Sequence, residues 1–188
     1  MRFEPLDGSG VFLIRLDVRR DERGAFARVW CADAFARAGI AFHPVQSNWS
    51  TTARRGTVRG MHVQRAPHGD SKLVRVTRGR IHDVIFDLRP SSPTLGRAFS
   101  IRLAEEDETA LFVPAGFAHG YQALTDAVTV EYLHGEAPYS PDHYDGFSPI
   151  DPDAAIEWPE PITLISEKDR EYPPLGPRLA TLYGGEAG

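Results

Sequence analysis

The chain has 188 residues, of which 41% are apolar and 25% charged, a composition typical of a globular domain with a hydrophobic core. A net charge of −5 argues against nucleic acid as the main partner, and no apolar run approaches the roughly 20 residues that would cross a membrane. Because the N-terminus lacks a signal-peptide pattern and the single Cys31 cannot form an internal disulfide, a cytoplasmic protein is expected.

Short apolar runs separated by glycine and proline predict an all-β domain, either a sandwich or a barrel, with few short helices. The expected strands are Val11–Leu16, Thr57–Gln64, Lys72–Val76, Ile81–Leu88, Ala98–Leu103, Ala110–Val113 and Val128–Leu133. A tight turn at Arg78-Gly79 separates the third and fourth of these runs. The two runs are therefore expected to form a hairpin.

Few segments of the sequence have a helical pattern. One short helix is expected at Ala32–Ala38, where a glycine follows, and a single helical turn at Asp151–Ala155. We expect one domain over residues 1–188, with its core at about 10–172. The tail, residues 173–188, is expected to be irregular and to wrap the surface or fray.

The spacing Pro114-x-Gly116-x-x-His119 predicts a tight turn that leads into a strand and points a histidine into the mouth of a barrel. It resembles the second half-motif of the cupin barrels. In metal cupins the first half-motif supplies a His-x-His pair and a glutamate, which together bind one ion. Here His62 is followed two residues later by Gln64, so the metal set is incomplete. The expectation is a cupin-like jelly-roll barrel with no metal and no other cofactor.

Nine sequence blocks between residues 15 and 172 can be compared, in their order along the chain, with the motifs of known families. They are DERGAFARVW, VQSNWSTT, RGMHVQ, KLVRVTRGRIHDVIFDLR, SPTLG, FVPAGFAHGYQAL, EYLHGEAPYSP, DPDAAIEWP and ISEKDR. In this order they resemble the dTDP-4-dehydrorhamnose 3,5-epimerase family. The resemblance implies cofactor-independent epimerisation at C3, C5 or both of a nucleotide-linked 4-keto-6-deoxyhexose, with dTDP as the expected nucleotide, in deoxysugar biosynthesis.

The resemblance also implies roles for four residues. His62 is implied as the general base, paired with Asp169, and Tyr132 as the proton donor on the opposite face of the sugar. Lys72 is implied to lie near the 4-keto oxygen. The chemistry of the reaction requires the same groups, because a proton beside a ketone can be removed only if a nearby positive charge stabilises the enolate oxygen. Inversion also needs a neutral base on one face and an acid on the other.

Further residues are implied to bind the substrate. Arg59 and His119 are implied to surround the sugar, and Tyr139 to stack on the base. The contacts implied for the nucleotide diphosphate come from Arg23, Gln46, Asn48 and Lys168. As in the related enzymes, the resemblance implies a homodimer in which an N-terminal strand of one subunit joins the other's sheet and the chain near Arg23 reaches the partner's site.

The sequence departs from the family pattern at four places. Arg28 and Tyr144 stand at substrate-contacting positions where the family usually has glutamate. Val63 follows the histidine where an aromatic residue is usual, and Pro149-Ile150 replaces a Trp-Asn or Trp-Asp pair. These changes fall around the nucleotide and the sugar periphery, so reaction type is better specified than substrate identity.

Other interpretations stay open at this level. The protein could invert only C3 or only C5, could be a metal-dependent cupin, or could bind a sugar nucleotide without turnover. Taken singly, Tyr132 could be a core aromatic and Lys72 a solvated residue at a sheet edge. Four further histidines are interpreted as structural or surface residues: His68, His82, His134 and His143.

Overall fold

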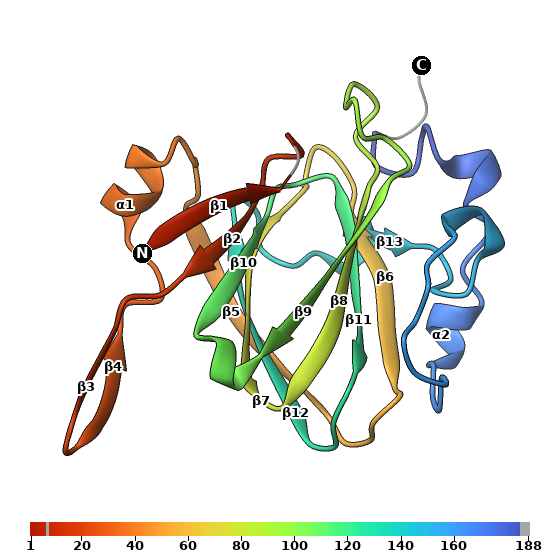
Figure 1. Cartoon of the computed structure of the whole chain (residues 1–188). Helices are drawn as coiled ribbons and strands as arrows, with labels where there is room; N and C mark the ends of the chain where they lie inside the picture. The colour runs from red at the N-terminus through yellow and green to blue at the C-terminus, as the bar shows by residue number, and fades with distance from the viewer. Residues whose placement is uncertain (7, 185–188) are drawn as a thin grey trace.

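The computed structural model describes residues 1–6 and 8–184, and two antiparallel sheets face each other within them (Figure 1). The larger sheet has the order β1-β2-β10-β7-β12-β5, and the smaller has the order β13-β6-β11-β8-β9. The larger contains β1 (Arg2–Leu6), β2 (Val11–Arg15), β5 (Pro44–Thr52), β7 (Ser71–Arg78), β10 (Thr109–Val113) and β12 (Val128–Gly135). The smaller contains β6 (Val58–Gln64), β8 (Arg80–Asp87), β9 (Ala98–Ala104), β11 (Phe117–Ala123) and β13 (Tyr144–Gly146). This architecture confirms the all-β prediction.

The hairpin expected around Arg78-Gly79 is wrong. β7 pairs with β10 and β12, whereas β8 pairs with β9 and β11, so these consecutive strands belong to different sheets. Both edges of β7 are occupied, and no edge remains for β8. Gly79, with φ of +77°, takes the chain across from one sheet to the other. A tight turn in the sequence does not distinguish a hairpin from this crossing.

The main core lies between the sheets and includes Val74, Val130 and Ile85. A second apolar cluster covers the outer face of the smaller sheet, where Leu175 and Leu182 of the C-terminal segment are buried against β8. Figure 1 shows this blue segment, with α2 (Glu167–Arg170), along that face. Within residues 173–184 the tail wraps the surface, and its leucines explain why it packs there; the rest of the predicted tail, 185–188, lies outside the described residues.

A third cluster covers the outer face of the larger sheet. It contains Phe35 of α1 (Ala32–Arg37), which stacks on Phe42 at 5.6 Å between ring centroids. Gly39 follows the helix with φ of +75°, a conformation that ends helices, so the predicted helix and its end are confirmed. The turn expected near residue 151 is also confirmed. The single-turn helices are η1 (Glu105–Asp107), η2 (Pro141–His143), η3 (Pro152–Ala154) and η4 (Gly176–Arg178).

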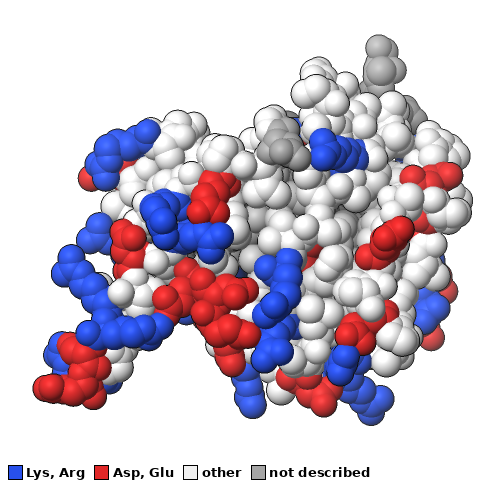
Figure 2. Space-filling view, in the orientation of Figure 1, with Lys and Arg blue, Asp and Glu red and all other residues white. Residues whose placement is uncertain are grey.

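A two-stranded hairpin of β3 (Val18–Asp21) and β4 (Gly24–Ala27) projects away from the barrel (Figure 1). Figure 2 shows charged side chains of both signs on it, at the lower left. Phe26 on this hairpin is 72% exposed. Among the described residues, no helix has the length and apolar character needed to span a membrane.

Candidate active site

A cavity of about 300 Å³ opens between the two sheets. Seven residues expected at the site line it: Asn48, His62, Lys72, His119, Tyr132, Tyr139 and Tyr144. Three residues that were not expected there line it as well: Trp49, Ser50 and His134. Residues from both sheets therefore meet in one space, and each wall of that space belongs to a different sheet.

His62, on β6, is paired with a buried carboxylate. Its Nε2 lies 2.7 Å from Oδ1 of Asp169, whose side chain is only 7% exposed. Burial opposes the charge of Asp169, but the hydrogen bond and charge of His62 and a bond from the Gly60 backbone lower its pKa overall. An ionised carboxylate can only accept, so Nε2 carries the hydrogen, and in the neutral form of the imidazole the lone pair is then on Nδ1. The geometry suits a proton acceptor in the cavity.

Local sequence explains how the His62 pair is built. Ser166 caps α2 by accepting a hydrogen bond from the Asp169 backbone N–H at 3.1 Å, which holds the carboxylate over β6. Gly60 has φ of +123°, and a Cβ there would lie 2.6 Å from Gly120 Cα. Only glycine permits this close approach of β6 and β11 beside the histidine.

A second imidazole and carboxylate lie on the same wall. His119 is the cross-strand neighbour of His62, so both side chains point to the same face. Its Nε2 lies 2.7 Å from Oδ1 of Asp83, a residue that is fully buried. Asp83 was missed from the sequence, although a carboxylate amid the apolar run of β8 is itself a signal of a buried polar site.

The opposite wall carries the cation and the phenol. Lys72 on β7 and His134 on β12 are register neighbours, and Tyr132 is the register neighbour of Asn48 on β5. Lys72 is 7% exposed on a central strand, so the interpretation as a solvated edge residue is wrong. Its Nζ lies 3.2 Å from Oδ1 of Asp70.

Burial raises the pKa of Tyr132 well above its ordinary range, with a further contribution from the neighbouring phenol of Tyr121. The phenol is therefore protonated at neutral pH and available as an acid. Its hydroxyl lies 3.4 Å from Ser50 Oγ. Ser50 in turn lies 3.2 Å from the Tyr121 hydroxyl. The contact with Ser50 holds the Tyr132 hydroxyl beside β5 of the larger sheet.

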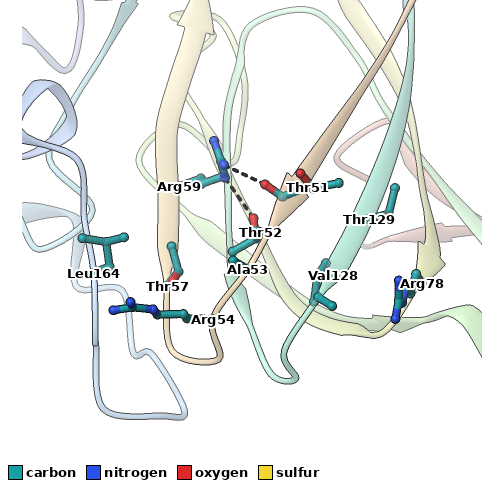
Figure 3. Close-up of a pocket in the computed structure, with 11 residues that line it drawn as sticks. Thr51, Thr52, Ala53, Arg54, Thr57, Arg59, Arg78, Val128, Thr129 and Leu164 are labelled. Carbon is teal, nitrogen blue, oxygen red and sulfur yellow. Dashed lines mark hydrogen bonds between the residues drawn. The ribbon is translucent and has the colours of Figure 1, made fainter.

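A larger cavity of about 420 Å³ lies at the other end of the strands (Figure 3). Figure 3 shows Arg59 turned towards β5, where Nε donates to Thr52 Oγ1 and Nη2 to the Thr51 carbonyl, both at 2.9 Å. Threonines and arginines give this cavity its polar lining, with no histidine or carboxylate among the residues that line it. Arg59 thus lines this neighbouring cavity. Its positive charge acts to lower the pKa of Tyr132, against the larger effect of burial.

The residues expected to contact the nucleotide are linked to one another by hydrogen bonds and ring contacts. Gln46 Nε2 donates to Asn48 Oδ1 at 2.9 Å, and Gln46 Oε1 accepts from the Tyr139 backbone N–H at 3.1 Å. The Tyr139 ring lies 5.0 Å from the Tyr144 ring in an edge-to-face arrangement. Lys168 Nζ lies 5.1 Å from the centroid of Tyr144, which forms a cation–π contact.

Two expected residues lie away from this cavity. Arg23 is on the β3–β4 hairpin, with its side chain 84% exposed and paired to Asp21. Arg28 follows the hairpin, and its Nη1 lies 3.8 Å from Cys31 Sγ. Val63, one of the departures from the family pattern, is buried in the cluster outside the smaller sheet and does not face the cavity.

His134, interpreted from the sequence as a structural or surface residue, is buried and lines the cavity. Tyr132 and His134 are two apart on one strand and therefore share a face, which is the signal that the sequence offered. Asp70, which bonds both His134 and Lys72, was also missed. The remaining histidines of that group do not line the cavity.

The donor set can be compared with a metal site. Within residues 1–6 and 8–184, no three His, Cys, Asp or Glu side chains are grouped so that they could hold one ion. His62 and His119 each direct Nε2 at a carboxylate of their own. The metal-dependent alternative gains no support from this arrangement.

Comparison with known proteins agrees with the geometry. Residues 6–176 match the dTDP-4-dehydrorhamnose 3,5-epimerase family. An enzyme of that name from Methanothermobacter thermautotrophicus is 42% identical over 93% of this chain and 94% of its own. The structure of a 4-keto-6-deoxy sugar epimerase from the novobiocin cluster of Streptomyces spheroides is 36% identical and superposes with a TM-score of 0.91, covering 100% of this chain and 94% of the other.

A third relative adds a bound nucleotide. The dTDP-4-dehydrorhamnose 3,5-epimerase from Bacillus anthracis, with TDP and PPi bound, is 35% identical over 93% of this chain and 99% of its own, with a TM-score of 0.87. The cupin-like fold expected from the sequence is confirmed by these structures. The chain therefore belongs to the dTDP-4-dehydrorhamnose 3,5-epimerase family of sugar isomerases.

Proposed function

We propose that this protein epimerises a dTDP-linked 4-keto-6-deoxyhexose at C3, C5 or both, by removing and returning carbon-bound protons without a cofactor. The observation that carries the proposal is that His62 and Tyr132 line opposite walls of one cavity, with Lys72 beside the phenol's strand. The nucleotide is inferred from the TDP held by the Bacillus anthracis relative. The sugar class is inferred from the activity named for the Streptomyces spheroides relative.

In the first step, Nδ1 of His62 takes a proton from the carbon beside the ketone. The electron pair of the broken C–H bond forms the carbon–carbon double bond of an enolate, and the carbonyl π pair moves to oxygen. Lys72 supplies the positive charge that meets this oxygen in a partly buried site. Asp169 stabilises the imidazolium through its bond to Nε2.

In the second step, Tyr132 gives its hydroxyl proton to the other face of the same carbon, and the ketone re-forms. The carbon is then inverted, His62 holds the abstracted proton, and Tyr132 is a phenolate. Both groups return to their starting states by exchange with solvent, so each inversion places a solvent-derived hydrogen on the carbon. No electrons are gained or lost overall.

We also infer a homodimer in which the β3–β4 hairpin of one protomer reaches the site of its partner. The supporting observations are that Arg23 lies away from its own cavity and that Phe26 on the same hairpin is 72% exposed. Light scattering should give twice the monomer mass, and a monomer would contradict the inference. The single Cys31 is a free thiol, which suits the cytoplasmic location that we propose.

The function is tested by incubating the protein with dTDP-4-keto-6-deoxyglucose in deuterated water and locating the deuterium by NMR. Deuterium at C3, C5 or both is expected, and its position distinguishes double from single epimerisation. UDP- and GDP-linked analogues serve as controls for the nucleotide. No incorporation from any of these ketosugars, with the fold intact by circular dichroism, would contradict the proposal.

A further inference from the structure

Two buried titratable residues of the cavity have no part in the reaction steps described above. His134 is 7% exposed and Asp70 is 6% exposed, yet they lie beside the lysine assigned to the enolate oxygen. Nδ1 of His134 lies 2.6 Å from Oδ2 of Asp70, while Oδ1 of Asp70 lies 3.2 Å from Nζ of Lys72. Burying a histidine, a carboxylate and an ammonium together costs free energy unless each is well hydrogen-bonded. A group of this kind in the cavity wall therefore indicates a functional role.

The hydrogen-bond pattern fixes the tautomer of His134. The Tyr139 backbone N–H can only donate, so it meets the oxygen of the Gln46 amide, and the Gln46 nitrogen must face Asn48. Asn48 therefore turns its own nitrogen towards Nε2 of His134, at 3.3 Å. An amide N–H cannot accept, so Nε2 must be the acceptor and the hydrogen must be on Nδ1.

A histidine with its hydrogen on Nδ1 is neutral and donates to Asp70. Burial opposes the charge of Asp70, but the charge of Lys72 and the hydrogen bond from His134 lower the pKa of that carboxyl overall. Asp70 is thus an ionised acceptor with one oxygen for each neighbour. The charge of Lys72 is balanced by one carboxylate, whose position depends on the imidazole.

We propose that Asp70 and His134 are positioning residues which link the ammonium of Lys72 to the amides of Asn48 and Gln46 in one hydrogen-bonded chain. This inference rests on the proposed function, because Lys72 is assigned there to the keto oxygen; the family resemblance implies that the two amides contact the nucleotide diphosphate. This hydrogen-bonded chain fixes the groups at the sugar end of the substrate relative to those at its nucleotide end. It also fixes which atom of Asn48 faces the cavity, since the amide cannot turn over without losing the bond to Nε2.

Two substitutions separate the two bonds of His134. The amide of asparagine lies near the place of Nδ1, so His134→Asn keeps a donor for Asp70 and loses the acceptor for Asn48. The amide of glutamine lies near the place of Nε2, so His134→Gln keeps the acceptor and loses the donor. The matched controls are His43→Asn and His43→Gln, since His43 is exposed and outside the cavity.

The bond to a charged partner is worth more than the bond between neutral groups. His134→Gln should lower kcat about ten- to hundredfold and leave KM within about twofold, because Lys72 loses its fixed carboxylate. His134→Asn should raise KM about three- to tenfold and lower kcat less than His134→Gln does. Equal losses in the same parameter for both variants would overturn the proposal, as would values equal to those of the His43 controls.

A measurement without substrate separates this inference from the proposed function. In ¹⁵N-labelled protein, the imidazole shifts of His134 should report a hydrogen on Nδ1 and a lone pair on Nε2 at neutral pH. A hydrogen on Nε2, or an imidazolium, would overturn the chain of bonds even if the wild type epimerises sugars. If the wild type exchanges no deuterium while the tautomer is as expected, the function fails and the hydrogen-bonded chain stands.

Discussion

The two walls of the cavity carry opposite chemistry. The wall from the smaller sheet presents two imidazoles, His62 and His119, each with Nε2 bonded to a buried carboxylate. The wall from the larger sheet presents the ammonium of Lys72 and the phenol of Tyr132. One wall is equipped to accept protons, and the other to donate a proton and to meet negative charge.

This difference teaches how a two-sheet barrel can invert a carbon. In the proposed mechanism a substrate between the sheets would turn one ring face towards each wall, so the acceptor and the donor would not need to move during the reaction. The carboxylates sit behind the imidazoles and set their tautomers, while Asp70 holds the ammonium in place. We expect substitutions on the two walls to give different signatures.

The largest effect is expected on the accepting wall. His62→Gln keeps an N–H for Asp169 but has no basic nitrogen, so it should slow deuterium exchange by about 10²- to 10⁴-fold. NMR of the recovered sugar measures the rate. Thermal melting should show that the fold persists, because the carboxylate keeps a partner. Exchange at the wild-type rate would remove His62 from the mechanism.

The charge on the opposite wall ranks second. Lys72→Gln should lower kcat by about 10²- to 10³-fold, because the enolate oxygen loses its positive neighbour. Lys72→Arg keeps the charge and serves as the matched comparison, with a smaller loss expected. Steady-state rates of the two variants decide the matter, and similar losses would mean that shape rather than charge matters at this position.

A smaller effect is expected on the pH dependence of the free energy of unfolding. The pKa of Asp169 is lowered in the folded protein, so its ionised form contributes stability above the ordinary aspartate pKa of about 3.9. That contribution is lost as the pH falls through the lowered value. Wild type should therefore exceed Asp169→Asn in free energy of unfolding at pH 7, and the gap should shrink below about pH 4. Urea unfolding from pH 7 to 3 measures it.

The matched control for this pH series is Asp142→Asn, at an exposed position in η2. Its difference from wild type should stay small throughout the series. A gap for Asp169→Asn that is constant from pH 7 to 3 would show that the carboxylate is not specifically stabilised in the folded state.

The smallest effect is expected far from both walls. Arg23→Ala should raise KM by a few fold and leave kcat near the wild-type value, because in the proposed homodimer this exposed arginine would reach the partner's site and bind phosphate. Arg19→Ala, on the same hairpin, is the control. An unchanged KM in a dimeric protein would place Arg23 outside the substrate site.

The sequence predicted the parts of the fold where apolar residues mark a core. It was weaker where polar residues face inward. β5 was not expected as a strand, because its inward residues include Gln46, Asn48 and Ser50, which line or support the cavity instead of a core. His134 and Asp70 were missed for a related reason, since their importance depends on pairing between strands that are distant in sequence.

The family resemblance supplied what single-residue patterns could not. Tyr132 alone is indistinguishable from a core aromatic, and Asp169 lies in a stretch of charged residues that would ordinarily be exposed. Its burial depends on the capped turn of α2 packing over β6, which is a tertiary contact. The crossing at Gly79 was mispredicted because local turn chemistry does not specify which sheet receives the next strand.

The assignment of opposite roles to the two walls is tested most directly by measuring exchange and inversion together in Tyr132→Phe. This variant keeps the base of the accepting wall and removes only the hydroxyl of the donating wall. Inversion should fall about 10²-fold or more, while deuterium exchange with retained configuration should fall much less. If exchange and inversion fall by the same factor in Tyr132→Phe, or if inversion is unaffected, protons do not pass from one wall to the other.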